Sequence, residues 1–429
     1  MGISQNISRK SHHITAGLWI AASVLGALPY LLSGQTASLT DAIFESVSGL
    51  TTTGSSIMAD PAALPTWLRI WRALTQWIGG LGLVLLIVAL VPSLRSGAGQ
   101  LYASEFSGTQ QRKLHPHMAG NVGRMWLIYT LLTVVMAALL AACGNSVADS
   151  LCLAMSTVST GGFMTAADGL ASYSNASMAV ITVFMFLSGV NVAMIYNFAT
   201  LHWRRLRRSD EFIVYTVVFA VAVALCTLAF GLSGLPWGRA ASFSLFHIAS
   251  TVSTCGFVGD MPTAWPFAVS VLTFMLIISG AMAGSTGGGL KLRRLMTLSR
   301  YLRNYFTRML HPGAMLTVRI DRQTVPTDYV NKIFGFVFLY ILFIIGGAFA
   351  LTLCGIGIAD AFCVAAANIS NLGPTPIVGA AGAGLYYTAL PNAAKWVLTV
   401  LMLAGRLEIF ALLAIVSPSY WRHRGKAQT

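Results

Sequence analysis

DAIFESVSGLTTTGSS (residues 41–56) is the first of four related sixteen-residue blocks in this chain. The other three are DSLCLAMSTVSTGGFM (149–164), FSLFHIASTVSTCGFV (243–258) and DAFCVAAANISNLGPT (360–375). The blocks align on the glycines Gly54, Gly162, Gly256 and Gly373, with an acidic residue thirteen positions earlier in three of the four. Recurrence of one unit along the chain indicates a repeat architecture.

Each block is predicted to form a short helix followed by a turn. Apolar residues recur with the spacing i, i+4, i+7, which places them on one face of a helix of about ten residues. Asp41, Asp149 and Asp360 stand where they can serve as caps or first-turn acids, and proton coupling is the alternative role. Glu45 and His247, nine positions before the glycine in one block each, are interpreted as packing or hydrogen-bonding residues rather than ion ligands.

The composition predicts a membrane protein. Of the 429 residues, 56% are hydrophobic and 9% are charged, which leaves too little polar surface for a water-soluble globule. A membrane-spanning helix needs about 20 apolar residues. Eight such spans are predicted, near 15–33, 65–92, 121–142, 176–200, 211–232, 264–283, 330–354 and 392–416. The first has no obvious small-residue cleavage site, so we interpret it as a retained helix rather than a signal peptide.

The net charge of +14 is interpreted as a topology signal rather than a nucleic-acid surface. Basic residues cluster at the N-terminus and in alternate connections, whereas the connections that hold the four blocks contain a single basic residue, Arg239. By the positive-inside rule, both termini and the basic linkers are predicted to face the cytoplasm.

The sequence contains no pattern typical of an enzyme. The six Cys and eight His residues are dispersed without metal-ligand spacing, and no Walker, nucleophile-elbow or zinc-protease motif is present. We therefore predict neither catalytic residues nor an organic cofactor.

The four loops are predicted to line one cation pore. A ten-residue helix cannot cross a bilayer, and loop backbone is tolerated in a membrane only where it is buried or lines a watery cavity. The partially negative helix C-termini would point at the pore, and loop carbonyls can replace the hydration shell of K⁺. No ring of carboxylates lines the loops, which disfavours Ca²⁺ or Mg²⁺. The predicted ligands are the carbonyl oxygens of Thr52, Thr53, Thr160, Gly161, Thr254, Cys255, Asn371 and Leu372.

A polar segment interrupts the apolar stretch after the third block. This segment, SGAMAGSTGGG (279–289), cannot remain a regular lipid-facing helix. It does not fit a phosphate-binding loop, because Leu290 separates the last glycine from Lys291. We predict a flexible segment in the pore below the filter, and a helix break for close packing is the alternative. The residues concerned are Gly284, Ser285, Thr286, Gly287, Gly288 and Gly289.

Arg406 lies inside the last apolar stretch, where a charge needs a partner or a water-filled cavity. We predict that it faces the pore as an electrostatic barrier. The alternatives are snorkelling or pairing with Glu408, although residues two apart on a helix point to different sides.

The order of span, short helix, Ser/Thr-Gly loop and span, repeated four times, resembles the Trk/Ktr/HKT superfamily of K⁺ transporters over nearly the whole chain. The resemblance is greatest to the bacterial TrkH/KtrB pore subunits. It rests on TTTGS (51–55), STGGF (159–163), STCGF (253–257), NISNLGP (368–374) and GRLE (405–408).

The resemblance implies an all-α membrane protein with four tandem M1–pore-helix–filter–M2 repeats around one pseudo-fourfold ion pore. It implies that 279–289 is the intramembrane gate and that Arg406 contacts the carbonyls of 284–289. It further implies a homodimer in the bacterial inner membrane, above a cytoplasmic regulatory ring of the TrkA/KtrA type that binds NAD or ATP/ADP.

We therefore predict K⁺ uptake, with K⁺ as the transported ion. A Na⁺-permeable or H⁺/Na⁺-coupled symporter of the same fold is the alternative, and a non-conducting scaffold or an enzyme is the alternative from other classes. Because the fourth loop departs from the Ser-Thr chemistry of the others, we expect loose ion discrimination and a gate from the third and fourth repeats only. The predicted divisions are 1–94 (repeat 1), 95–119 (cytoplasmic linker), 120–208 (repeat 2), 209–300 (repeat 3), 301–328 (cytoplasmic linker), 329–417 (repeat 4) and 418–429 (cytoplasmic tail).

Overall fold

The computed structural model describes residues 2–82, 118–199, 208–259, 262, 265–373, 387–410 and 412–413. Most of the predicted linker at 95–119 and the whole predicted tail at 418–429 lie outside these residues. The helices are α1 (Gly2–Leu32), α2 (Leu39–Leu50), α3 (Thr66–Leu81), α6 (Met118–Ala142), α7 (Val147–Val158), α8 (Asn175–Ser188), α9 (Val192–Ala199), α11 (Asp210–Leu232), α12 (Trp237–Val252), α13 (Phe267–Ser279), α14 (Leu292–Leu310), α15 (Thr327–Leu353), α16 (Ile358–Ile369) and α17 (Asn392–Arg406). Strands β1 (Arg319–Ile320) and β2 (Gln323–Thr324) form a small antiparallel hairpin.

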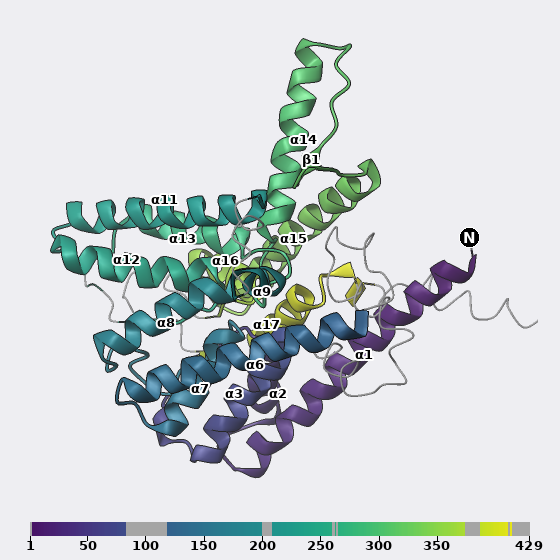
Figure 1. The fold of residues 1–429 in the computed structure, drawn as a ribbon. Coiled ribbons are helices and arrows are strands. Elements are labelled where there is room, and N and C mark those ends of the chain that lie inside the picture. Colours follow the sequence, from purple (N-terminus) through teal and green to yellow (C-terminus); the bar gives the residue numbers. More distant parts are fainter. Residues whose placement is uncertain are drawn as a thin grey trace, which may run out of the picture.

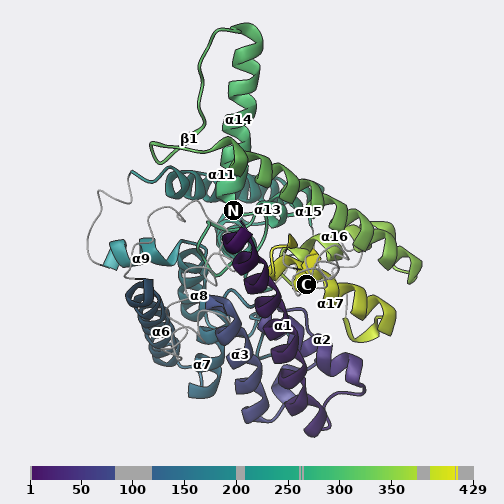
Figure 2. The same ribbon diagram turned by 90° about the vertical axis from the view of Figure 1, so that its right-hand side faces the viewer.

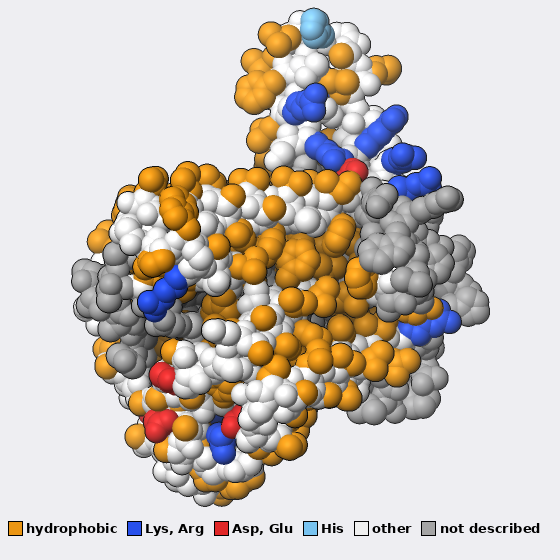
Figure 3. Space-filling view, turned by 60° about the vertical axis from the view of Figure 1, so that its left-hand side comes forward, with side chains coloured by type: hydrophobic (Ala, Val, Ile, Leu, Met, Phe, Trp, Pro, Cys, Tyr) orange, Lys and Arg blue, Asp and Glu red, His pale blue; other side chains and the backbone are white. Residues whose placement is uncertain are grey.

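Each repeat begins with a long apolar helix, α1, α6, α11 or α15, which packs along the short helix that follows it (Figure 1). All four long helices contain a stretch that is long and apolar enough to cross a membrane. On α11 the exposed residues Val217, Val221 and Leu225 recur every four positions, so one face is apolar and uncovered. Hydrophobic side chains cover much of the body in Figure 3, whereas Lys and Arg gather near the base of the projecting segment that contains α14. This surface fits a protein surrounded by lipid.

The second helix of each repeat is shorter than predicted or broken. The predicted span at 176–200 consists of two helices, α8 and α9, and the chain bends by 113° between them. The predicted span at 392–416 is also not continuous, because α17 ends at Arg406 and the backbone turns left-handed at Glu408 (φ 54°) and Ile409 (φ 51°). Hydropathy measures apolar content and not backbone continuity, so it predicts a span at both places but does not reveal where the helix breaks. The helix α13 ends at Ser279, where the polar segment begins, as the sequence predicts.

The four repeats close into a ring. The second helix of each repeat packs against the short helix of the next: α3 against α7, α8 against α12, α13 against α16, and α17 back against α2. In Figure 2 the repeats follow one another around the centre, with α2 and α3 below it, α6 to α8 on the left, α11 and α13 just above it and α15 to α17 on the right. Four copies of one unit thus surround a single axis.

Two ion pairs join neighbouring repeats at the start of the short helices. Asp41 and Asp149 are first-turn acids, and the N-caps are the serines Ser38 and Ser146. Lys395 on α17 pairs with Asp41 (Nζ–Oδ1 2.6 Å), and both side chains are nearly buried. Arg69 on α3 makes the equivalent pair with Asp149 (2.9 Å), but both of these side chains are partly exposed. The charge pair between the fourth and first repeats is therefore the more shielded of the two.

The third block departs from this pattern because its helix starts earlier. The helix α12 begins at Trp237, so Phe243 lies in its middle, where an acid could not serve the helix N-terminus. Phe243 instead packs on Phe230 (centroids 5.1 Å apart) and stacks on His247 (5.8 Å). The ring nitrogen Nε2 of His247 is hydrogen-bonded to Thr273 Oγ1 (2.9 Å), which confirms the predicted hydrogen-bonding role.

We expect Asp41→Asn to destabilise the protein more than Asp149→Asn. Breaking a buried ion pair costs about 3–5 kcal/mol, because the remaining charge is left uncompensated, whereas exposed pairs contribute about 0–1 kcal/mol. Thermal unfolding of the purified protein in detergent, followed by fluorescence, measures the two shifts in Tm. Equal shifts would contradict the role of the Lys395–Asp41 pair in closing the ring.

Candidate functional site: four filter loops and the segment beneath them

The four loops leave their helices in the same way. In the first, Thr52 N donates to Gly49 O (3.0 Å) and Thr53 N to Ser48 O (2.9 Å), which is the reversed pairing of a Schellman motif. The other three loops repeat this pairing at Thr160 and Gly161, Thr254 and Cys255, and Asn371 and Leu372. The motif uses the orphan carbonyls at the end of each short helix to satisfy the first N–H groups of the loop.

The motif requires a left-handed residue, and three of the four loops place a threonine there. The φ angles are 56° at Thr52, 55° at Thr160, 61° at Thr254 and 51° at Asn371. A β-branched residue at positive φ is strained, and such strain persists only where the surrounding structure enforces it, commonly at functional sites. The aligned glycines two residues later also have positive φ, from 76° to 83°.

The glycines of the four loops interlock around the ring. A Cβ atom added to Gly54 would overlap the carbonyl oxygen of Gly161 in the second loop. The same relation joins Gly162 to the Cys255 carbonyl, Gly256 to the Leu372 carbonyl and Gly373 to the Thr53 carbonyl. Each carbonyl oxygen just before a filter glycine therefore lies against the glycine of the preceding loop. The structure brings all four predicted loops together at one level.

One predicted ligand has a partner in the protein. The Gly161 carbonyl oxygen accepts a hydrogen bond from Gln76 Nε2 (2.6 Å), so α3 holds this part of the second loop. A carbonyl oxygen has two lone pairs, and this bond uses one of them. The sequence did not single out Gln76, which lies in a predicted span near Gly79 and Gly80.

The segment 280–289 lies directly under the loops. A Cβ atom at Gly287 would lie 2.6 Å from the Ser253 carbonyl oxygen. A Cβ atom at Gly288 would overlap the Ser370 carbonyl oxygen. Gly288 N donates to Thr254 Oγ1 (2.7 Å). Glycines therefore allow the segment to approach the backbone of the third and fourth loops.

The bend between α8 and α9 holds the same segment from the second repeat. Asn191 Nδ2 donates to Ala283 O (2.7 Å), and Val192 N donates to Gly284 O (3.1 Å). Asn191 Oδ1 also accepts from Ala193 N (2.8 Å), at the start of α9. This contact was not predicted; its signal in the sequence is an Asn two residues after a glycine inside an apolar stretch, at Gly189-Val-Asn191.

Arg406 joins the segment to the first repeat. Its Nη1 donates to Thr286 O (3.1 Å), which is the predicted contact with the 284–289 carbonyls, and its Nη2 donates to Gly80 O (2.8 Å) and Gly79 O. Glu408 instead pairs with Arg294 (2.6 Å). Residues of the first and second repeats also contact this region, because ring closure places the first repeat beside the fourth and the second beside the third.

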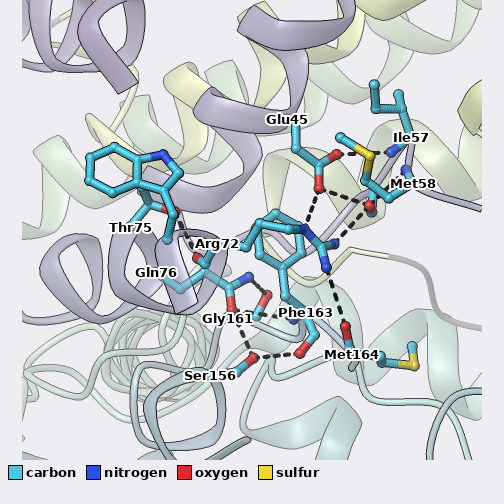
Figure 4. A network of polar contacts seen from close by, with 12 residues as sticks. Glu45, Ile57, Met58, Arg72, Thr75, Gln76, Ser156, Gly161, Phe163 and Met164 are labelled. Atoms are coloured by element: carbon cyan, nitrogen blue, oxygen red, sulfur yellow. Dashed lines mark hydrogen bonds and ion pairs between the residues drawn. The ribbon is translucent and has the colours of Figure 1, made fainter. Parts of the chain in front are cut away.

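A buried polar network lies behind the first two loops (Figure 4). Glu45 pairs with Arg72 Nε (2.9 Å) and accepts a hydrogen bond from Ile57 N (2.9 Å). This confirms the predicted hydrogen-bonding role of Glu45, but Arg72 was missed. An arginine inside a predicted span, in the same repeat as a glutamate inside a pore helix, was the signal.

Comparison with known proteins identifies the family. The chain matches the TrkH family, described as cation transport proteins, over residues 4–422. It belongs to that family. It is 32% identical over 426 residues to the Trk system potassium uptake protein TrkH of Escherichia coli (strain K12), covering 97% of this chain and 86% of the relative. It is 33% identical over 423 residues to the TrkH protein of Halomonas elongata.

A solved structure gives the same result. The crystal structure of the potassium transporter TrkH from Vibrio parahaemolyticus superimposes with a TM-score of 0.86 at 30% identity, covering 96% of this chain and 86% of that one. The all-α fold of four repeats and the superfamily predicted from sequence are confirmed. The chain is a multi-pass membrane transporter and not an enzyme.

We expect Gly256→Ser to reduce discrimination between cations by roughly tenfold or more. A side chain at φ 79° is strained, and its Cβ would overlap the Leu372 carbonyl, so the loop must shift. Strain of about 1–2 kcal/mol corresponds to roughly a tenfold change in an equilibrium constant. The ratio of Rb⁺ to Na⁺ flux in proteoliposomes measures the effect. Gly238→Ser is the matched control, because Gly238 has open space and no positive φ. An unchanged ratio in Gly256→Ser would mean that this glycine is not part of the filter.

Proposed function

We propose that this chain forms the pore for K⁺ uptake across the membrane. The ring of four interlocked loops, in which each filter glycine lies against the preceding carbonyl of the next loop, is the observation that carries the proposal. The relatives named as potassium uptake proteins support K⁺ as the transported ion.

In this proposal the ligands are the eight carbonyl oxygens predicted from the sequence: Thr52, Thr53, Thr160, Gly161, Thr254, Cys255, Asn371 and Leu372. Positive φ at alternate positions turns successive peptide groups, and four helix C-termini direct partial negative charge toward the loops. Carbonyl dipoles suit a weakly hydrated monovalent cation, which exchanges water for backbone oxygen at modest cost.

We further propose that residues 284–289 and Arg406 form the gate. The glycines of the segment lie against the loop backbone, so ions that leave the filter would meet this segment next. Arg406 donates a hydrogen bond to the Thr286 carbonyl oxygen of this segment and adds a positive charge beside it. Both features oppose cation passage until the segment moves.

Partners and location are also proposals. The relatives belong to a Trk system, which supports a multi-component assembly. We propose a homodimer in the bacterial inner membrane, with both termini cytoplasmic, that works with a nucleotide-binding ring of the TrkA/KtrA type. The basic residues near α14 support a cytoplasmic position for the projecting segment. The repeat boundaries at 94, 208, 300 and 417 belong to the same proposal.

The direct test is ion flux into proteoliposomes that contain the purified chain. We expect Rb⁺, a K⁺ substitute, to enter faster than Na⁺ under equal gradients at fixed pH. Equal entry of both ions would favour the Na⁺-permeable alternative, and entry that requires a proton or Na⁺ gradient would favour coupled symport. Protein-free liposomes supply the background.

We expect Arg406→Ala to raise Rb⁺ flux several-fold. The substitution removes the hydrogen bonds to the Thr286, Gly79 and Gly80 carbonyls and one positive charge from the region below the filter. One lost hydrogen bond to a charged group is worth about 1.5–3 kcal/mol. Arg303→Ala is the control, because Arg303 is exposed on α14. Unchanged or reduced flux in Arg406→Ala, at wild-type thermal stability, would refute a gating role.

A further inference from the structure

The buried ion pair between Glu45 on α2 and Arg72 on α3 is unusual for its position. The Glu45 side chain is 0% exposed and the Arg72 side chain 3% exposed. Removing two charges from water is costly, so such a pair is tolerated only where further hydrogen bonds satisfy both groups. The partners of this pair therefore indicate what it holds.

Both charges bind the segment that follows the first filter loop, Glu45 through a backbone N–H and a serine hydroxyl and Arg72 through the same hydroxyl. Glu45 Oε2 accepts from Ile57 N (2.9 Å), and Ser56 Oγ donates to Glu45 Oε1 (2.8 Å). Arg72 Nη2 donates to Ser56 Oγ (2.9 Å). Residues 56 and 57 lie two and three positions after Gly54, so the pair fixes the chain just beyond the filter glycine. Figure 4 shows Glu45 beside Arg72 and Ile57.

The same guanidinium reaches the second loop. Arg72 Nη1 donates to Met164 O (3.3 Å), and its Cζ lies 4.3 Å from the centre of the Phe163 ring. One turn along α3, Gln76 Oε1 accepts from Ser156 Oγ (2.7 Å) and Phe163 N (3.3 Å). Residues four apart share a helix face, so one face of α3 anchors two neighbouring filter loops.

The second and fourth repeats show that packing does not require these charges, whereas the third repeat has His247 at the position of Glu45. Alignment on the filter glycine places Leu153 and Val364 at the position of Glu45. Alignment of the second helices on Gly80, Gly189 and Arg406 places Ile181 and Leu398 at the position of Arg72. The apolar residues belong to hydrophobic core clusters in the second and fourth repeats, so an apolar pair fits the fold there.

We infer that Glu45 and Arg72 are positioning residues that set ion selectivity by holding the exits of the first and second filter loops. The inference rests on the proposed K⁺ pore. Na⁺ is the smaller ion, and carbonyls can coordinate it well only by closing in. A charged pair that ties two loops to α3 opposes that movement, whereas an apolar pair would fill the same space without fixing the backbone.

The test compares folded variants that keep the Glu45–Arg72 hydrogen bonds to the loops with folded variants that lack them. Glu45→Leu/Arg72→Ile copies the apolar pair of the second repeat and leaves no unpaired charge. Ser56→Ala removes only the hydroxyl that bridges the two side chains. Arg69→Gln is the matched control, because Arg69 is on α3 but pairs with Asp149 away from the filter loops. Rb⁺ and Na⁺ fluxes are measured in proteoliposomes, and Tm is measured in detergent.

We expect the double variant to lower the Rb⁺/Na⁺ flux ratio by about tenfold, because losing one hydrogen bond to a charged group changes an equilibrium constant by about that much. Ser56→Ala should lower the ratio less. Arg69→Gln should keep the wild-type ratio. A wild-type ratio in the folded double variant would overturn the inference, and a wild-type ratio in Ser56→Ala would do so if the double variant fails to fold. Absence of selective flux in the wild-type protein would instead refute the proposed K⁺ pore.

Discussion

Four stretches of backbone leave helical geometry in the interior of a membrane protein, where a peptide group without a partner has no water to bind. The Schellman motif at the end of each short helix satisfies this constraint locally, because the first N–H groups of the loop donate hydrogen bonds to the last carbonyl oxygens of the helix. The loop carbonyls just before the four glycines lie against the glycines of the neighbouring loops. The long first helices and the ring of second helices pack around the four loops. This packing holds the strained threonines in their left-handed conformation.

The parts of this structure that depend on local residue choice could be predicted from the sequence. The positive φ of the loop glycines needs glycine at a fixed spacing from each short helix, so the four loops leave a visible pattern, whereas the left-handed φ at Thr52, Thr160 and Thr254 is not indicated by a β-branched residue. The short helices leave a pattern too, and so does the glycine-rich segment at 284–289. Phe243 looked like an exception only because the start of α12 at Trp237 cannot be read from the spacing alone.

Contacts between repeats could not be predicted in the same way. The bend at Gly189-Val-Asn191 interrupts a stretch that is apolar enough to be a span, and Asn191 at the bend donates a hydrogen bond to Ala283, 92 residues away. Arg72 and Gln76 act on a loop of the next repeat, which becomes a neighbour only when the ring closes. A charged residue inside a predicted span indicates that it has a partner in the folded protein. A single sequence does not reveal which residue that partner is.

The helix α3 connects the filter to the segment beneath it. Its middle holds the exits of the first two loops through Arg72 and Gln76, and its end supplies the Gly79 and Gly80 carbonyls that accept from Arg406. Gly79 packs so closely under the end of α2 that a Cβ there would overlap the Leu50 carbonyl. A protein interior packed this tightly transmits displacement rather than absorbing it. The helix that positions two of the four loops therefore also holds Arg406 and, through it, the segment below the loops.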